Sequence, residues 1–291
     1  MTGVFIKNNQ KKEYIKRLGK PYTKNGKCKF FLDQFVAGAG NELSGKFWNA
    51  KSSSRFAFDL YSWMAYDKTI SDFEFEYHLP GLASGGMGPN MDVYLETRDE
   101  VIFIESKFSE LANLHYIDNK YLSEAYYTEK EYGKKKLTLL ERYYGFAFAQ
   151  DFSNFCYEIE AAMNENGWHE GDDWFEPKQE TCHLAGLLIH IMKNKVRFDG
   201  KKVKLHNIYY SMKGDGRSEL LEFFESKVTK LIERIKPVFG NISIEFKSFS
   251  VQEMLEDNNR LSDGIKFPAD ICNRIESFTT LAEGKTRKDM K

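Results

Sequence analysis

Residues 89–107 read PNMDVYLETRDEVIFIESK, a stretch with the pattern of a β-hairpin. Its first half alternates apolar and polar residues, and its second half is a β-branched and aromatic run. Residues 97–100 separate the two halves and are polar, as expected of a hairpin loop. The pattern therefore predicts two antiparallel strands with this register: Glu96 opposite Val101, Tyr94 opposite Phe103 and Asp92 opposite Glu105.

The predicted register gathers two carboxylates and a lysine on one patch. Cross-strand partners have Cβ atoms about 5 Å apart, so Asp92 and Glu105 would repel each other unless a cation lay between them. Side chains alternate between the faces of a strand, so Lys107 projects from the same face as Glu105. The alternative is an ordinary surface cluster of ion pairs. Against it, residues 101–104 are apolar on both faces, which is typical of a buried central strand.

Length and composition indicate a globular protein that does not span a membrane. The chain has 291 residues, 42% of them hydrophobic and 29% charged, which is enough for a full core. Its longest apolar run, 184–192, is far shorter than the ~20 residues that a membrane span needs. The N-terminus has no hydrophobic region of signal-peptide length. The four cysteines form no CxxC pair, which indicates reduced thiols, and we expect a cytoplasmic protein.

Periodicity and capping residues predict the other elements of an α/β fold. In chain order they are a helix capped by Asn41, a helix capped by Ser52–Ser54, a strand at 72–79, a helical insertion at about 110–175, a helix at 179–194, a strand at 203–212, a helix ending at Pro237 and a strand at 242–246. The helix at 179–194 would form a crossover onto a parallel strand. The predicted organisation is a basic segment at 1–34, one domain at 35–283 and a disordered tail at 284–291.

Two side-chain patterns lead to further expectations. The strand at 72–79 alternates strictly, which predicts that these four residues face inward: Phe73, Phe75, Tyr77 and Leu79. His183 and His190 lie seven residues apart, and no carboxylate shares their spacing. We therefore interpret both as core or surface histidines rather than ligands.

Positive charge is concentrated at the N-terminus, although the formal net charge of the chain is −1. Residues 1–29 contain nine Lys or Arg and one acid, and shorter basic clusters occur at 134–136 and 193–204. Clustered cations beside an acidic patch suit a polyanionic substrate, because phosphate contacts dominate nucleic-acid affinity. Neutral proteins also segregate charge, so solvated helix faces and a mobile terminus are the alternative interpretation.

Opposed carboxylates on a sheet are suited to a hard divalent cation. A site with few protein ligands and several waters indicates Mg²⁺, with Mn²⁺ as a substitute. The cation would relieve the repulsion between Asp92 and Glu105, lower the pKa of a bound water and polarise a phosphoryl oxygen. Lys107 would hold the attacking water or stabilise the charge that grows on the phosphorane. Glu42, in the first turn of an upstream helix, is the candidate third acid.

These residues resemble the PD-(D/E)xK signature of the restriction-endonuclease-like nucleases. The motifs that carry the resemblance are PNMD at 89–92, ESK at 105–107, ELSGKF at 42–47 and FEYHLPGL at 75–82. Their order is similar to that in a family of predicted bacterial restriction endonucleases. The resemblance covers roughly residues 35–255.

The resemblance implies an αβββαβ core and magnesium-dependent hydrolysis of phosphodiester bonds in double-stranded DNA, in restriction-type defence against foreign DNA and often as a homodimer. By the same resemblance, Asp92, Glu105 and Glu42 would bind the metal, and Lys107 would be catalytic. Two alternatives stay open. One is a nuclease-fold protein that binds nucleic acid without cutting it, and the other is a structural protein whose basic N-terminus binds an acidic partner.

Overall fold

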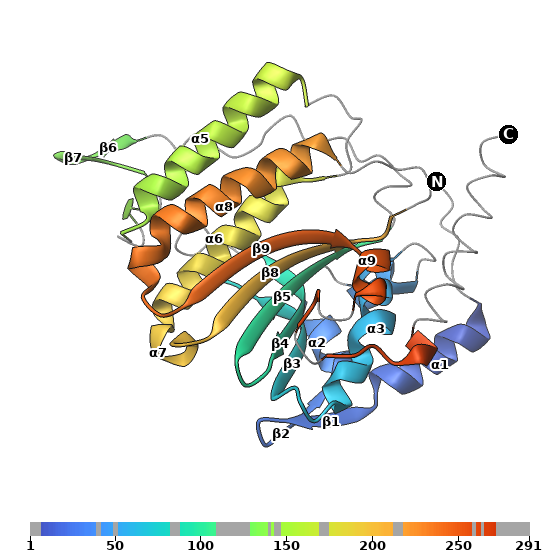
Figure 1. The fold of residues 1–291 in the computed structure, drawn as a ribbon. Coiled ribbons are helices and arrows are strands. Elements are labelled where there is room, and N and C mark those ends of the chain that lie inside the picture. Colours follow the sequence, from blue (N-terminus) through green and yellow to red (C-terminus); the bar gives the residue numbers. More distant parts are fainter. Residues whose placement is uncertain are drawn as a thin grey trace, which may run out of the picture.

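A mixed five-stranded sheet lies at the centre of the molecule, with helices on both faces (Figure 1). The structure, a computed structural model, describes residues 7–38, 42–48, 52–81, 88–108, 129–138, 141–142, 147–168, 175–211, 218–257, 260–262 and 265–271. From one edge to the other, the strands are β3 (Asp72–His78), β4 (Asn90–Glu96), β5 (Glu100–Lys107), β8 (Lys202–Tyr209) and β9 (Ser243–Ser250). β3, β4 and β5 are antiparallel neighbours, whereas β8 and β9 run parallel to β5. The predicted α/β class is confirmed.

The hairpin formed by β4 and β5 has the predicted register, over these pairs: Glu96–Val101, Leu95–Ile102, Tyr94–Phe103 and Val93–Ile104. Asp92 and Glu105 follow next in the same register, one step beyond the last pair of the ladder. Every residue of β5 except Lys107 is buried. β5 is therefore a central strand packed on both faces, as its apolar run predicted.

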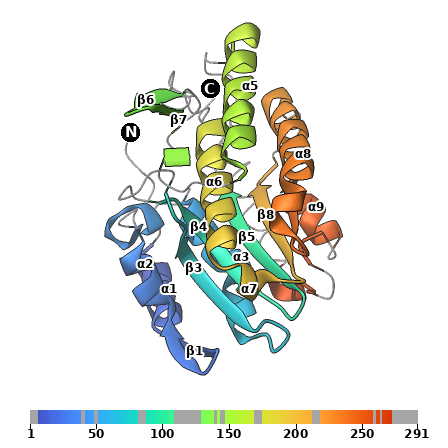
Figure 2. The same cartoon turned by 90° about the vertical axis from the view of Figure 1, so that its left-hand side faces the viewer.

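Two crossover helices and a third helix cover one face of the sheet. α6 (Pro177–Lys193) connects β5 to β8, and α8 (Glu219–Phe239) connects β8 to β9. Figure 2 shows α6 running across the sheet, with α5 (Ala149–Asn166) and α8 beside it. Apolar side chains of these helices and of the sheet form one core cluster, here called the first cluster. The predicted crossover onto a parallel strand is confirmed.

α8 does not end at Pro237, as the sequence predicted, but continues to Phe239. Phe239 is buried and stacks on Phe148, with ring centroids 5.7 Å apart. Burial of this ring favours two more helical residues after the proline.

The opposite face of the sheet is covered mainly by N-terminal elements. They are α1 (Asn8–Leu18), β1 (Pro21–Lys24), β2 (Lys27–Phe30), α2 (Phe31–Ala37), the 3₁₀ helices η1 (Glu42–Ser44) and η2 (Lys46–Trp48), α3 (Ser53–Tyr61) and the 3₁₀ helix η3 (Ser62–Tyr66). α9 (Val251–Glu256) joins them from the other end of the chain. Their apolar residues form a second cluster, rich in aromatic rings. Ser52 caps α3 as predicted, since its side chain accepts a hydrogen bond from the Arg55 N–H.

β3 changes face in its middle. Phe73 and Phe75 lie in the second cluster, but Leu79 belongs to the first cluster and Tyr77 packs against that same cluster. The change occurs at Glu76, whose φ of +52° is in the left-handed region. All four apolar residues face a core cluster, as predicted, but they do not share one face of the sheet, because a left-handed residue changes the direction of the side chains that follow it.

The basic N-terminal segment is folded onto the body of the protein from residue 7 onward. Leu18 and Tyr22 are part of the second cluster. Several of its cations are bound internally: Arg17 to Asp59, Lys24 to the backbone carbonyls of Asp67 and Ile70, and Lys29 to Asp72 and Glu74. Lys12 and Lys16 are exposed. The interpretation as a mobile terminus is thus wrong for this part of the segment, and only some of its charge faces solvent.

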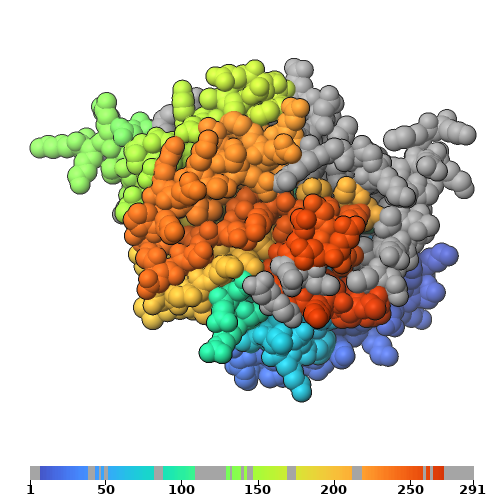
Figure 3. Space-filling view, in the orientation of Figure 1, coloured from blue at the N-terminus to red at the C-terminus, as the bar shows by residue number. Residues whose placement is uncertain are grey.

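The insertion that the sequence predicts to be helical contains a β-hairpin. β6 (Lys130–Tyr132) and β7 (Lys135–Leu137) pair across a turn at Gly133, whose φ is +67°. A glycine in this conformation favours a tight hairpin turn, and periodicity alone does not reveal this local preference. The hairpin carries the basic residues 134–136 and projects from the body (Figure 3, green). Residues 109–128 lie outside the described part of the chain.

Among the described residues, Cys28, Cys156 and Cys182 are not joined in disulfide bonds. Within the described ranges, no helix combines the length and the apolar character that crossing a membrane requires. The tail predicted to be disordered, 284–291, lies outside the described residues.

Candidate active site

Asp92 and Glu105 bring two carboxyl groups together on neighbouring strands. The backbone N–H of Ser106 donates a hydrogen bond of 2.7 Å to Asp92 Oδ2 and holds this side chain toward β5. Desolvation, and then the charges of Glu105 and Glu76, raise the pKa of Asp92 well above its usual range. Two poorly solvated acids this close favour either a shared proton or a bound cation.

Two side chains from different elements hold Glu105. Lys107 Nζ donates to Glu105 Oε1 at 2.9 Å, in agreement with the prediction that they share a face. Gln179, in the first turn of α6, donates through Nε2 to the same oxygen at 2.7 Å. Its Oε1 accepts a hydrogen bond from Lys107 Nζ at 2.5 Å. The three side chains form a closed set of hydrogen bonds, so each one positions the other two.

Gln179 was not predicted as a site residue, although the crossover contains a signal for it. In a strand–helix–strand crossover the helix starts at the edge of the sheet where the first strand ends. A polar residue in the first turn of α6 must therefore lie near the end of β5. Gly186 allows α6 to pack closely on the segment that follows β3, since an added Cβ would lie 2.8 Å from the carbonyl oxygen of Pro80.

His183 lies beside Glu105, and the expectation that no carboxylate shares its spacing is wrong. Its Nε2 is 3.7 Å from Glu105 Oε2, and its Nδ1 is 3.9 Å from Glu180 Oε2. Glu180 precedes His183 by three residues, a spacing that places both on one helix face. Desolvation by itself lowers the pKa of His183, but the two acids outweigh it and raise the pKa above 6.5. His183 is therefore a buried core histidine, as predicted, and its ring lies beside Glu105.

His190 is partly buried and packs against Tyr77 and Phe103, which agrees with the prediction of a core or surface histidine. Its Nε2 is 3.2 Å from the hydroxyl of Tyr77. Desolvation, followed by the positive charges of Arg197 and Lys193, lowers the pKa of His190 to about 4. The ring is thus neutral at pH 7 and belongs to the packing of α6 on the sheet.

Glu76, on β3, adds a third carboxyl group to those of Asp92 and Glu105. These three residues are here called the acidic row. The register of β3 and β4 sets Glu76 opposite Asp92, where β3 changes face. Asn90 Nδ2 donates to Glu76 Oε2 at 3.4 Å. The charge of Glu76 contributes to the raised pKa of Asp92. From sequence alternation alone, Glu76 was one polar residue among several on an outer face, and nothing in its spacing pointed to the site.

Glu42, the predicted helix acid, begins the 3₁₀ helix η1 instead of an α-helix. Asn41, its predicted cap, and the side chain of Glu42 lie outside the described residues. The chain just before them reaches the acidic row. Gly38 lies so close to Glu76 that an added Cβ would be 2.8 Å from Glu76 Oε2.

The donor set suits a divalent cation with few protein ligands. Among the residues that the structure describes, no three His, Cys, Asp or Glu side chains gather into a ready-made metal-binding group. Asp92 and Glu105 still offer hard oxygen ligands whose mutual repulsion a cation would relieve. A pair of carboxylates leaves most coordination positions to water, which is the usual situation for Mg²⁺.

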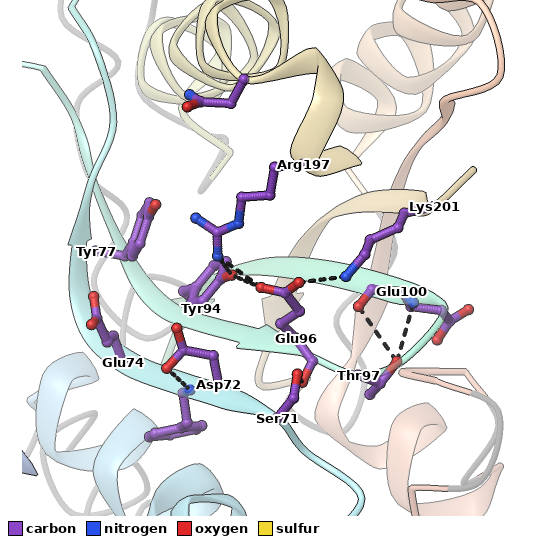
Figure 4. Close-up of polar contacts among 12 residues, drawn as sticks. Ser71, Asp72, Glu74, Tyr77, Tyr94, Glu96, Thr97, Glu100, Arg197 and Lys201 are labelled. Atoms are coloured by element: carbon purple, nitrogen blue, oxygen red, sulfur yellow. Dashed lines mark hydrogen bonds and ion pairs between the residues drawn. The ribbon is translucent and has the colours of Figure 1, made fainter. Parts of the chain in front are cut away.

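A second polar cluster, at the other end of β4, is a structural anchor (Figure 4). Glu96 accepts hydrogen bonds from Arg197 at 2.7 Å and from the hydroxyl of Tyr94 at 2.5 Å, and it pairs with Lys201. Arg197 belongs to α7 (Lys195–Phe198), so the cluster ties the connection before β8 to the sheet. Two cations neutralise one acid here, whereas acids predominate in the row at Asp92.

The structure brings together three of the four predicted site residues, Asp92, Glu105 and Lys107. Gln179, His183 and Glu76 join them from elements that are distant in the sequence. The chain matches no protein-family model, no curated protein and no solved structure. Its function is therefore inferred from the geometry of the site and from the motifs of the sequence.

Proposed function

We propose that this protein is a magnesium-dependent deoxyribonuclease of the restriction-endonuclease-like type, which cuts double-stranded DNA in defence against foreign DNA. The observation that carries the proposal is the pair of facing carboxylates, Asp92 and Glu105, with Lys107 bonded to Glu105. The order of elements α3, β3, β4, β5, α6 and β8 supports the αβββαβ core that the resemblance implies.

In this proposal, the residues of the site have separate roles in phosphodiester hydrolysis. A bound Mg²⁺ would supply Lewis-acid chemistry and lower the pKa of a coordinated water. Asp92 and Glu105 would hold the cation through oxygen, and Lys107 would stabilise the negative charge that grows on the phosphorane. Gln179 would keep Lys107 and Glu105 in a fixed relation through its two hydrogen bonds.

A polyanionic substrate is supported by exposed lysines on two elements. Lys12 and Lys16 lie on the solvent side of α1, and the β6–β7 hairpin exposes residues 134–136. Such side chains bind phosphates without reading sequence.

The test is a cleavage assay on plasmid, linear, methylated and single-stranded DNA, with and without Mg²⁺. We expect wild-type protein to cut double-stranded DNA only with Mg²⁺, and Lys107→Ala to reduce the rate by roughly 100-fold or more. Lys230→Ala, an exposed lysine on α8, is the matched control and should cut normally. Circular dichroism would verify that each variant is folded.

Failure to cut any of the four substrates with Mg²⁺ would overturn the enzymatic proposal. Salt-dependent DNA binding in the same samples would then indicate a nucleic-acid-binding protein without catalysis. Equal cutting by wild type and Lys107→Ala would show that the activity lies elsewhere.

A further inference from the structure

Asn207, in β8, carries a buried amide whose hydrogen-bonding groups are not used by the described residues. The residue is 1% exposed. In the part of the chain that the structure describes, neither Nδ2 nor Oδ1 has a hydrogen-bond partner. A buried amide without partners is unfavourable and rare in native proteins, so a ligand is a physical reason for keeping one.

The register of the sheet places this amide beside the acidic row. Asn207 is the β8 partner of Glu105 in the parallel pairing of β5 and β8. Partners on neighbouring strands project from the same face of the sheet. That face is the one of the first cluster, which contains Phe103, two residues before Glu105, and Leu205, two residues before Asn207. The side chain of Asn207 therefore stands next to that of Glu105, under the helices that cover this face.

The neighbours of Asn207 already have other partners. Glu105 Oε1 accepts hydrogen bonds from Lys107 and Gln179, and its Oε2 faces His183. On the other side, the β9 partner of Asn207 is Ser248, whose backbone N–H donates to Glu225 of α8 at 2.6 Å. Next to the acidic row, on β8, the amide of Asn207 thus offers one donor and one acceptor that the described residues do not use.

We propose that Asn207 is a further binding residue of the site, whose Oδ1 accepts a hydrogen bond from the water shell of a divalent cation held by Asp92 and Glu105. This inference rests on the proposed function and extends it. A cation with two carboxylate ligands keeps several waters, and polarised waters need acceptors. The amide donor, Nδ2, suits an oxygen of the phosphate group to which the cation is bound.

The test is a titration with Mn²⁺, in which electron paramagnetic resonance measures the free ion, so that no activity is needed. Asn207→Leu keeps the approximate size and removes both polar groups, and Asn207→Asp keeps an acceptor and adds charge. We expect Asn207→Leu to bind Mn²⁺ at least tenfold more weakly than wild type, and Asn207→Asp to bind it as tightly or more tightly. Without Mn²⁺, the melting temperature of Asn207→Leu should be equal to or above that of wild type, because no unpaired amide stays buried.

Ile208→Val is the matched control, since Ile208 follows Asn207 in β8 but lies in the second cluster. It should lower the melting temperature and leave Mn²⁺ binding unchanged. Wild-type binding with unchanged affinity in Asn207→Leu would overturn the inference and leave the proposed function intact. Absence of Mn²⁺ binding by the wild type, or full binding by Asp92→Asn, would overturn both.

Discussion

Glu76 has a backbone conformation that few residues other than glycine adopt, in the middle of a strand. A left-handed residue of this kind costs roughly 1–3 kcal/mol, and such strain is often found at functional sites. Glu76 lies opposite Asp92, between Phe75, which packs in the second cluster, and Tyr77, which packs against the first. The strained residue therefore both directs the strand and adds an acid to the candidate site.

The comparison of Glu76→Gly with Glu76→Ala separates these two roles. Both variants remove the carboxyl group, but only glycine accepts a φ of +52° without strain. We expect the glycine variant to be more stable than the alanine variant by about 1 kcal/mol in denaturant unfolding. In both variants the pKa of Asp92 should fall, because one of the charges that raise it is gone. Equal stability of the two variants would show that Glu76 is not left-handed in solution.

At the scale of elements, the connection from α6 to β8 depends on one carboxylate. Glu96 is bonded to Arg197 in α7 and to Lys201 just before β8, and it also binds Tyr94 on its own strand. This anchor fixes where β8 begins, and β8 carries Asn207. The cluster at one end of the sheet thus helps to determine the register at the other end.

Glu96→Gln should lower the free energy of unfolding at pH 7 by about 2 kcal/mol, because it weakens charge-assisted hydrogen bonds in a cluster that is mostly buried. Desolvation by itself raises the pKa of Glu96, but the bonds from Lys201, Tyr94 and Arg197 outweigh it and hold the pKa below 4.5. A pKa that is lower in the folded state stabilises the fold at neutral pH, and this stabilisation is lost as the pH falls through that value. Urea unfolding between about pH 7 and pH 3 should show the difference between wild type and variant shrinking in acid. A difference that is constant with pH would contradict this account.

At the scale of the whole molecule, the cations of the N-terminal segment divide into those bound internally and those exposed to solvent. On the face covered by α1, Arg17, Lys24 and Lys29 are bound to the core, and their loss would destabilise the fold. Lys12 and Lys16 are exposed on the same helix as Arg17. The charge of the N-terminal segment is therefore partly structural and partly available to a polyanion.

If α1 binds DNA phosphates, Lys12→Glu combined with Lys16→Glu should weaken DNA binding uniformly across sequences. The slope of log affinity against log salt should become shallower by about 0.9 for each phosphate that α1 no longer neutralises. Fluorescence anisotropy over a range of salt concentrations measures this slope, and the melting temperature should not change. Lys230→Glu combined with Lys236→Glu, on α8 across the sheet, is the charge-matched control. The same change of slope in both double variants would indicate a net-charge effect rather than phosphate binding by α1.

Local patterns in the sequence were sufficient for much of the fold. The polar residues 97–100 predicted the register of β4 and β5, because a loop of this length sets Glu96 opposite Val101 and the other pairs follow from it. Ser52 identified the start of α3, and the crossover of α6 followed from the order of elements. The same information brought Asp92, Glu105 and Lys107 together, since all three lie within one hairpin.

Only the tertiary structure decided what surrounds this hairpin. Gln179 and His183 reach Glu105 because α6 packs over β5, and Asn207 reaches it because β8 pairs with β5 in one parallel register. The change of face at Glu76 and the internal bonds of the N-terminal cations also depend on contacts between distant segments. Sequence periodicity reports which face of an element is apolar but not which element will cover that face. The chain by itself therefore determined the paired carboxylates and their lysine, and long-range packing determined the residues that position them.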